Sequence, residues 1–205
     1  MEALLAFAAA LVALRLAGRV FGRWRVRHAA ELLAWSAALF AYAAAAAALA
    51  WGAAHGWDAR SFRAYYLFGG LLTAPLLGAG SLLIWRRRWA GPLALVYAGL
   101  AVGIAVAVPV HGSFSGGGIP AAQDHLAFVP ARLVAVLANS LGTLAVVLVA
   151  ALTFRRRPLG NVLIVLGVGI AALGTALAGL GVSGTAAFAL AAVLVLYAGF
   201  VAPSR

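Results

Sequence analysis

Residues 65–81, YYLFGGLLTAPLLGAGS, decide the class of fold and pose the main question about this chain. The stretch is apolar enough to lie in lipid, yet it contains four glycines, a proline, a threonine and a serine. Glycine and proline are more frequent in transmembrane helices than in soluble ones. Two interpretations are open: a helix broken to form a binding site or pore, or a helix whose small residues let its neighbours pack closely.

The composition of the whole chain favours a membrane protein. Hydrophobic residues make up 66% of the 205 residues and charged residues only 9%, whereas a soluble domain is roughly half apolar and about a quarter charged. The chain has no cysteine and no lysine. Disulfides, thiol catalysis, cysteine-ligated zinc and lysine Schiff bases are therefore excluded.

The apolar residues fall into several segments, each close to the ~20 residues that cross a bilayer core. Backbone groups in lipid must bond within their own segment, so we expect helices. The sequence thus predicts an all-α polytopic membrane protein, a single transmembrane domain over 1–205 with a bundle of seven transmembrane helices. The expected spans are 3–22, 31–53, 62–85, 90–110, 132–154, 161–181 and 184–202.

The arginines orient this bundle. Most of them lie in alternate loops, after the first, third and fifth spans, and the positive-inside rule assigns those loops to the cytoplasm. The N-terminus is then outside, the C-terminus is in the cytoplasm, and 111–131 is a long extracytoplasmic loop. This placement explains the net charge of +11 without nucleic acid. It predicts contact with anionic lipids at Arg86, Arg87, Arg88, Arg155, Arg156 and Arg157.

Small residues recur at every fourth position in two of the spans. Such a stripe lets helix backbones approach each other, so we expect both helices to lie in the bundle interior. The stripe residues are Gly70, Ala74 and Gly78 in span 62–85, and Gly167, Ala171, Thr175 and Gly179 in span 161–181.

Pro75 lies near the middle of span 62–85. Because proline has no N–H, it should free the carbonyl of Leu71 and kink the helix. Pro75 with Thr73 is the part of this stretch that would serve a site, while packing is the favoured role of the glycines.

Polar side chains inside the spans have two interpretations. Asn139 and Thr143 are four residues apart and share a helix face. The amide either forms an interhelical hydrogen bond that fixes packing or lines a cavity for a solute. The candidate lining residues are Asn139, Ser140, Thr143, Thr73 and Thr175.

No catalytic constellation is visible, and we expect no enzyme activity and no cofactor. The span centres hold no Asp or Glu, which argues against a proton or sodium pump. His111, Asp124 and His125 share the long loop and would hold a metal only if the fold brought them together. We interpret them as ordinary loop residues and predict no metal site.

Two stretches, FRAYYLFGGLLTAPLLGAGS (62–81) and GNVLIVLGVG (160–169), resemble in this order an uncharacterised family of seven-helix multi-pass membrane proteins from high-GC, actinobacterial-type bacteria. The resemblance implies a place in the bacterial cytoplasmic membrane. It carries no activity over to this chain.

The sequence favours a small channel or transporter, with a path near spans 62–85, 132–154 and 161–181. The alternative is a receptor-like or partner-binding membrane component that transports nothing. A second copy of the chain or another membrane protein is then the candidate partner. Transport is favoured because the short cytoplasmic loops leave a receptor little surface for signalling.

Overall fold

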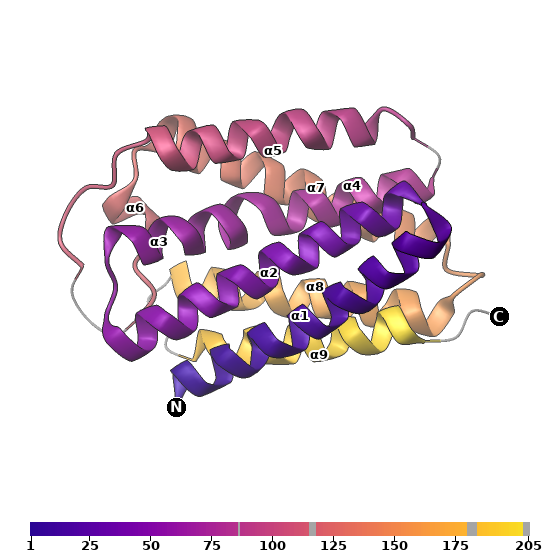
Figure 1. Ribbon diagram of the computed structural model, residues 1–205, viewed down its shortest axis with the longest axis horizontal. Coiled ribbons are helices and arrows are strands. Elements are labelled where there is room, and N and C mark those ends of the chain that lie inside the picture. Colours follow the sequence, from indigo (N-terminus) through magenta and orange to yellow (C-terminus); the bar gives the residue numbers. More distant parts are fainter. Residues whose placement is uncertain (86, 115–117, 180–183, 203–205) are drawn as a thin grey trace.

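The computed structural model describes residues 1–85, 87–114, 118–179 and 184–202, which form helices and turns and no strand (Figure 1). The prediction of an all-α fold is confirmed. The helices are α1 (Glu2–Arg27), α2 (Ala30–His55), α3 (Ala59–Tyr65), η1 (Tyr66–Leu72), α4 (Thr73–Ile84), α5 (Ala90–Ala107), α6 (Ala122–His125), η2 (Phe128–Arg132), α7 (Leu133–Leu152), α8 (Pro158–Gly179) and α9 (Thr185–Val201).

Within the described residues, 6 helical segments are long and apolar enough to cross a membrane. Helices α3, η1 and α4 together form one of them, Ala59–Ile84, and η2 with α7 forms another, Phe128–Leu152. Helix α9 is apolar but shorter, with 17 residues. The architecture is therefore that of a multi-pass membrane protein.

Five helices of the long segments and the shorter α9 form a closed ring. Going round it, α1 packs on α2, α2 on α4, α4 on α7, α7 on α8, α8 on α9, and α9 back on α1. Helix α5 stands outside this ring and packs on α4 and η1 (Figure 1). Chain neighbours are therefore mostly neighbours in space, while the ring closes through the first and last helices.

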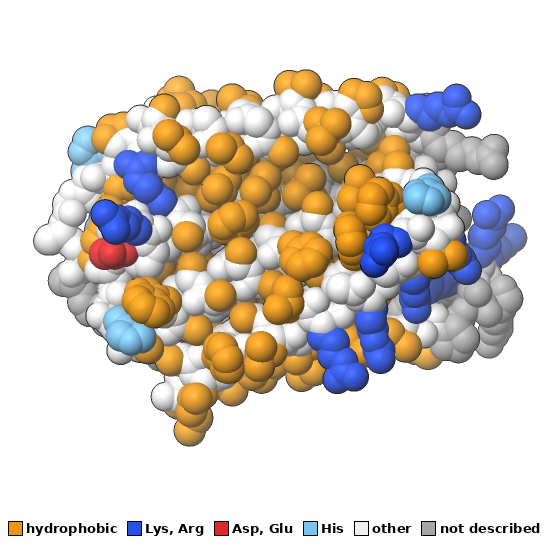
Figure 2. Space-filling view, in the orientation of Figure 1, with side chains coloured by type: hydrophobic (Ala, Val, Ile, Leu, Met, Phe, Trp, Pro, Cys, Tyr) orange, Lys and Arg blue, Asp and Glu red, His pale blue; other side chains and the backbone are white. Residues whose placement is uncertain are grey.

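One end of the bundle is basic, and we call it the arginine-rich end. The α1–α2, α4–α5 and α7–α8 turns lie there, at the right of Figure 1, and α9 ends there, whereas the N-terminus lies at the other end. Figure 2 shows blue side chains gathered toward this end and hydrophobic ones across the middle. Described arginines in or beside these turns are Arg23, Arg25, Arg27, Arg87, Arg88, Arg155, Arg156 and Arg157.

Local chemistry fixes where two helices begin. Pro158 is the first residue of α8, a position whose N–H has no partner within the helix in any case. Asp58 caps α3: the Ser61 N–H and hydroxyl both donate to its Oδ1, at 2.7 and 2.6 Å. These hydrogen bonds from Ser61 hold the pKa of the exposed Asp58 carboxyl below its ordinary value.

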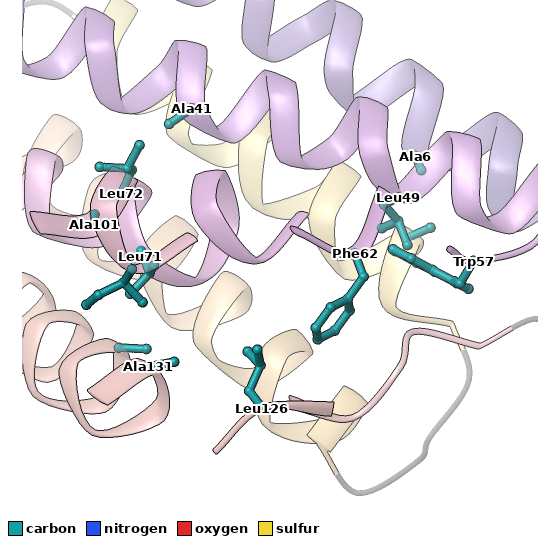
Figure 3. Close-up of a cluster of buried hydrophobic side chains, with 13 residues drawn as sticks. Ala6, Ala41, Leu49, Trp57, Phe62, Leu71, Leu72, Ala101, Leu126 and Ala131 are labelled. Carbon is teal, nitrogen blue, oxygen red and sulfur yellow. The ribbon is translucent and has the colours of Figure 1, made fainter. Parts of the chain in front are cut away.

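The end opposite the arginines holds a buried apolar cluster that includes Trp57, Phe62 and Leu126 (Figure 3). The described part of 111–131 folds onto this cluster. The His111 N–H donates to the His125 carbonyl at 2.9 Å, and the buried His125 ring stacks on Phe114 at 4.3 Å. The long loop therefore packs against the helices at this end.

Candidate functional site

The break in residues 65–81 is a π-helical segment, η1, followed by the proline-containing start of α4. The carbonyl of Leu71, which Pro75 cannot bond, accepts a hydrogen bond from the Tyr97 hydroxyl of α5 at 2.7 Å. The Thr73 hydroxyl donates to the Phe68 carbonyl at 2.7 Å. The Phe68 carbonyl also accepts from the Thr73 backbone N–H, so the Leu71 carbonyl is the one that depends on a side chain. An unsatisfied carbonyl in lipid costs several kcal/mol, and the Tyr97 bond removes that cost.

The side-chain amide of Asn139, which was predicted to need a hydrogen-bond partner, bonds to a carbonyl of the same π-helical segment. Asn139 Nδ2 on α7 donates to the Gly70 carbonyl at 2.6 Å. Three neighbouring carbonyls of the break are thus bonded by side chains from α4, α5 and α7. The break has its hydrogen bonds supplied from within the bundle, which favours packing over a ligand site here.

Helices α4 and α7 touch backbone to backbone directly below this break. An ideal Cβ on Gly78 would lie 2.7 Å from the Gly142 Cα, and a Cβ on Gly142 would lie 2.6 Å from the Ala74 carbonyl carbon. Neither position has room for a methyl group. Ala74 and Gly78 therefore belong to a close helix contact, and Gly142 is the partner that the sequence did not indicate.

Replacing Tyr97 with phenylalanine should destabilise the protein only when residue 75 is proline. Tyr97→Phe leaves the Leu71 carbonyl without a donor, and we expect a loss of about 1 kcal/mol in unfolding free energy, as for strong interhelical bonds in membranes. In a Pro75→Ala background the new N–H can bond this carbonyl, so the same change should cost roughly nothing. Chemical unfolding in detergent measures the coupling as a double-mutant cycle.

Tyr42→Phe is the matched control for this cycle. The Tyr42 hydroxyl donates to the Ala189 carbonyl of α9 at 2.7 Å, which is not a carbonyl of the break, so its loss should be additive with Pro75→Ala. An equal cost of Tyr97→Phe in both backgrounds would contradict the role given to Tyr97.

The second small-residue stripe contacts α9. A Cβ on Gly167 would lie 2.7 Å from the Leu196 Cγ. The exposed Thr175 bonds back to the Ala171 carbonyl at 2.9 Å, and Gly179 is the last residue of α8. Gly70 differs from the others, since its nearest neighbour is the Tyr66 ring of its own segment, at 3.2 Å.

The remaining predicted polar residues do not converge on one place. Ser140 is exposed and Thr143 is half-buried, both on α7. His125 Nδ1 lies 2.8 Å from the His111 carbonyl oxygen, whereas Asp124 is exposed. No group of three metal-binding side chains occurs within the described residues.

The structure instead shows a cavity of about 150 Å³ near the arginine-rich end. It lies between α4, α7 and α8, with Trp35 of α2 and Phe200 of α9 completing its wall. Most lining side chains are apolar. The polar lining residues are Ser81, Thr153, Asn161, Arg156 and Arg157.

Asn161 links the two helices that flank the arginine run. Its Nδ2 donates to the Ala150 carbonyl and to the Thr153 Oγ1, each at 3.0 Å. The Thr153 hydroxyl donates in turn to the Val149 carbonyl at 2.7 Å. These bonds hold the end of α7 to the start of α8 and so fix the turn that carries Arg155, Arg156 and Arg157.

The two lining arginines differ in their surroundings. Arg157 Nη2 donates to the Gly199 carbonyl at 3.3 Å and the Ala202 carbonyl at 2.9 Å, while its buried Nε has no partner among the described residues. A buried N–H without a partner costs about 1–3 kcal/mol. Arg156 is exposed at the cavity mouth.

Of the other arginines predicted to contact lipid, the described ones lie outside the cavity lining. Arg87 packs over the Trp85 ring, with 4.5 Å from its Cζ to the ring centroid. Arg88 and Arg155 are exposed, and Arg86 lies outside the described residues. Arg156 and Arg157 are thus the members of this set that the fold brings to a cavity.

Comparison with known proteins adds no assignment, since no family, no curated protein and no solved structure matches this chain. The function must therefore be argued from the cavity and the helices around it.

Proposed function

We propose that this chain is a seven-span transporter of small solutes whose binding site is the cavity between α4, α7 and α8. The proposal places the arginine-rich end in the cytoplasm of a bacterial cell, with the N-terminus outside, in keeping with the positive-inside rule and with the family that the sequence resembles. The observation that carries it is the cavity itself, about 150 Å³ with polar groups set in apolar walls.

The position of the cavity supports a transporter over an open channel. Its lining includes the exposed Ile84 and Arg156, so it reaches the surface at the arginine-rich end. Beyond Leu77, toward the opposite end, the close contact of Gly142 with Ala74 and Pro75 leaves no room between α4 and α7. A solute would pass only if these helices separated, as in alternating access around a fixed site.

Filling the cavity should abolish transport. In liposomes carrying the purified protein, a panel of radiolabelled solutes should show flux for the wild type, and Ser81→Leu should reduce it to the protein-free background. Ser81 is buried in the lining. The matched control is Ser140→Leu on the exposed face of α7, which should transport normally.

A receptor-like or partner-binding component is the second candidate, and the closed contact between α4 and α7 favours it, because a sensor needs a binding site but no path. Absence of flux for every solute in the panel, from protein that remains folded, would make this candidate the better one.

A further inference from the structure

The donors in the cavity wall select a charge type for the ligand. We propose that the cavity binds a small amphipathic anion, with its carboxylate or phosphate group at Arg156 and Arg157 and its apolar body between Trp35, Phe200 and the α4 and α7 side chains. The proposal rests on the proposed function only in using the same cavity.

The hydroxyl and amide donors of the lining are already engaged with the protein. Both hydrogens of Asn161 Nδ2 are used, toward the Ala150 carbonyl and the Thr153 Oγ1. The Thr153 hydroxyl donates to Val149, and the Ser81 hydroxyl donates to the Leu77 carbonyl at 3.0 Å. A sugar or another neutral polar solute would therefore find few hydroxyl or amide donors to replace its water.

The two arginines are the positively charged residues of the lining. Two bonds from Nη2 hold the Arg157 guanidinium in place. Its Nε is buried, so a ligand would meet the terminal nitrogens of this side chain. Arg156 is exposed beside it and lines the same cavity. Guanidinium groups bind carboxylates and phosphates through paired, charge-assisted hydrogen bonds.

No acidic side chain competes for these arginines within the cavity. The chain has only 4 acidic residues, and Glu2, Asp58 and Asp124 belong to the opposite end of the bundle or its loops (Figure 1). Glu31, at the start of α2, is absent from the lining. The field at the cavity mouth is therefore positive, which attracts anions.

The apolar part of the cavity sets the size of the ligand body. Trp35 and Phe200 meet edge to face, with centroids 5.1 Å apart, and Leu77, Val146 and Val168 complete the wall. Dry apolar cavities of roughly this volume hold a benzene ring. The expected ligand is thus an anion on an aromatic ring or on a short stretch of acyl chain.

Binding of 4-fluorobenzoate and its neutral analogue 4-fluorobenzamide tests the proposal. The full-length protein in phosphatidylcholine nanodiscs is titrated and followed by ¹⁹F NMR. We expect the benzoate to bind at least about tenfold more tightly than the benzamide, because a hydrogen bond to a charged group contributes that much or more. Equal affinity of the two probes would overturn the proposal.

Matched variants locate the bound anion. Arg156→Gln should weaken benzoate binding roughly tenfold, whereas Arg155→Gln, an exposed arginine of the same turn that is absent from the lining, should leave it unchanged. Ser81→Leu should abolish binding while thermal unfolding shows a folded protein. Equal losses of benzoate affinity in Arg155→Gln and Arg156→Gln would show that surface charge alone causes the effect, and would overturn the assignment of the anion to the cavity.

Nanodiscs containing phosphatidylglycerol separate two sources of the anion. If benzoate binds more weakly in these nanodiscs and binding is restored when the protein is returned to phosphatidylcholine, the site binds a lipid headgroup. If binding is unchanged, the site binds a free anion. Each outcome supports an anion site. Benzoate binding without flux of any solute would refute the proposed transport function but support the anion site. Flux without a preference for benzoate over benzamide would support transport but refute the anion site.

Discussion

Gly142→Leu should prevent recovery of folded protein, and Gly142→Ala should lower the free energy of unfolding by about 1–3 kcal/mol, the usual cost of overpacking. The Cβ of either side chain would lie 2.6 Å from the Ala74 carbonyl carbon and 2.8 Å from the Pro75 nitrogen. These neighbours are backbone atoms, which cannot move aside by changing a rotamer. Helices α4 and α7 would have to separate, and the Asn139 bond to Gly70 would lengthen with them.

The control uses a glycine with open space around it. Gly99 lies on α5 with no atom within 4 Å of its ideal Cβ, so Gly99→Ala should stabilise the helix by roughly 0.5–1 kcal/mol, as alanine does in helix interiors. Chemical unfolding in detergent, followed by circular dichroism, compares the two alanine variants. Stabilisation of both proteins would show that the contact between α4 and α7 is loose.

The spacing of small residues in 65–81 predicts close packing against another helix, but it does not identify that helix. The spacing of Ala74 and Gly78 defines a helix face, because residues four apart lie above one another. It carries no information about the partner helix. Gly142 follows Asn139 on α7 by three residues, and only the tertiary fold places both beside the break.

The sequence also could not identify the hydrogen-bond donor for the freed carbonyl of Leu71. The chemistry of proline predicts that Leu71 loses its bond, and the structure supplies the Tyr97 hydroxyl in its place. Tyr97 lies on α5, in a span with no other polar side chain that would draw attention to it. Propensity and periodicity describe one helix at a time, whereas this bond joins two.

The cavity residues were visible in the sequence but were interpreted differently. The arginine run predicts contact with lipid headgroups for Arg156 and Arg157, and the structure also places both in the lining of the cavity. The available signal was the pair of polar residues, Thr153 and Asn161, on either side of that run. Polar side chains at the facing ends of consecutive helices can meet, and here they do, at 3.0 Å.

The number of spans depends on α9. Its 17 residues extend about 26 Å at 1.5 Å per residue, slightly less than the hydrocarbon core of about 30 Å. Local thinning of the bilayer accommodates such a mismatch at modest cost. Helix α9 also packs along α1 and α8, two helices long enough to cross, so an orientation parallel to theirs favours a seventh span.

Cysteine labelling at the two ends of the chain should show opposite sides of the membrane. The chain has no cysteine of its own, so a cysteine inserted after Met1 and, in a second protein, Ala202→Cys report without background. We expect a membrane-impermeant maleimide to label the first in intact cells and the second only after permeabilisation.

Two internal positions serve as controls for this labelling. Ser113→Cys in the long loop should behave like the N-terminal cysteine, and Arg155→Cys, in the turn before α8, like Ala202→Cys; both native residues are exposed. Labelling of both chain ends from the same side would mean an even number of spans, with α9 lying along the surface. Exchange of the inner and outer sites would invert the bundle and put the cavity mouth outside the cell. A solute would then enter this site from outside, because the arginines and the cavity share one end of the helices whichever way the protein faces.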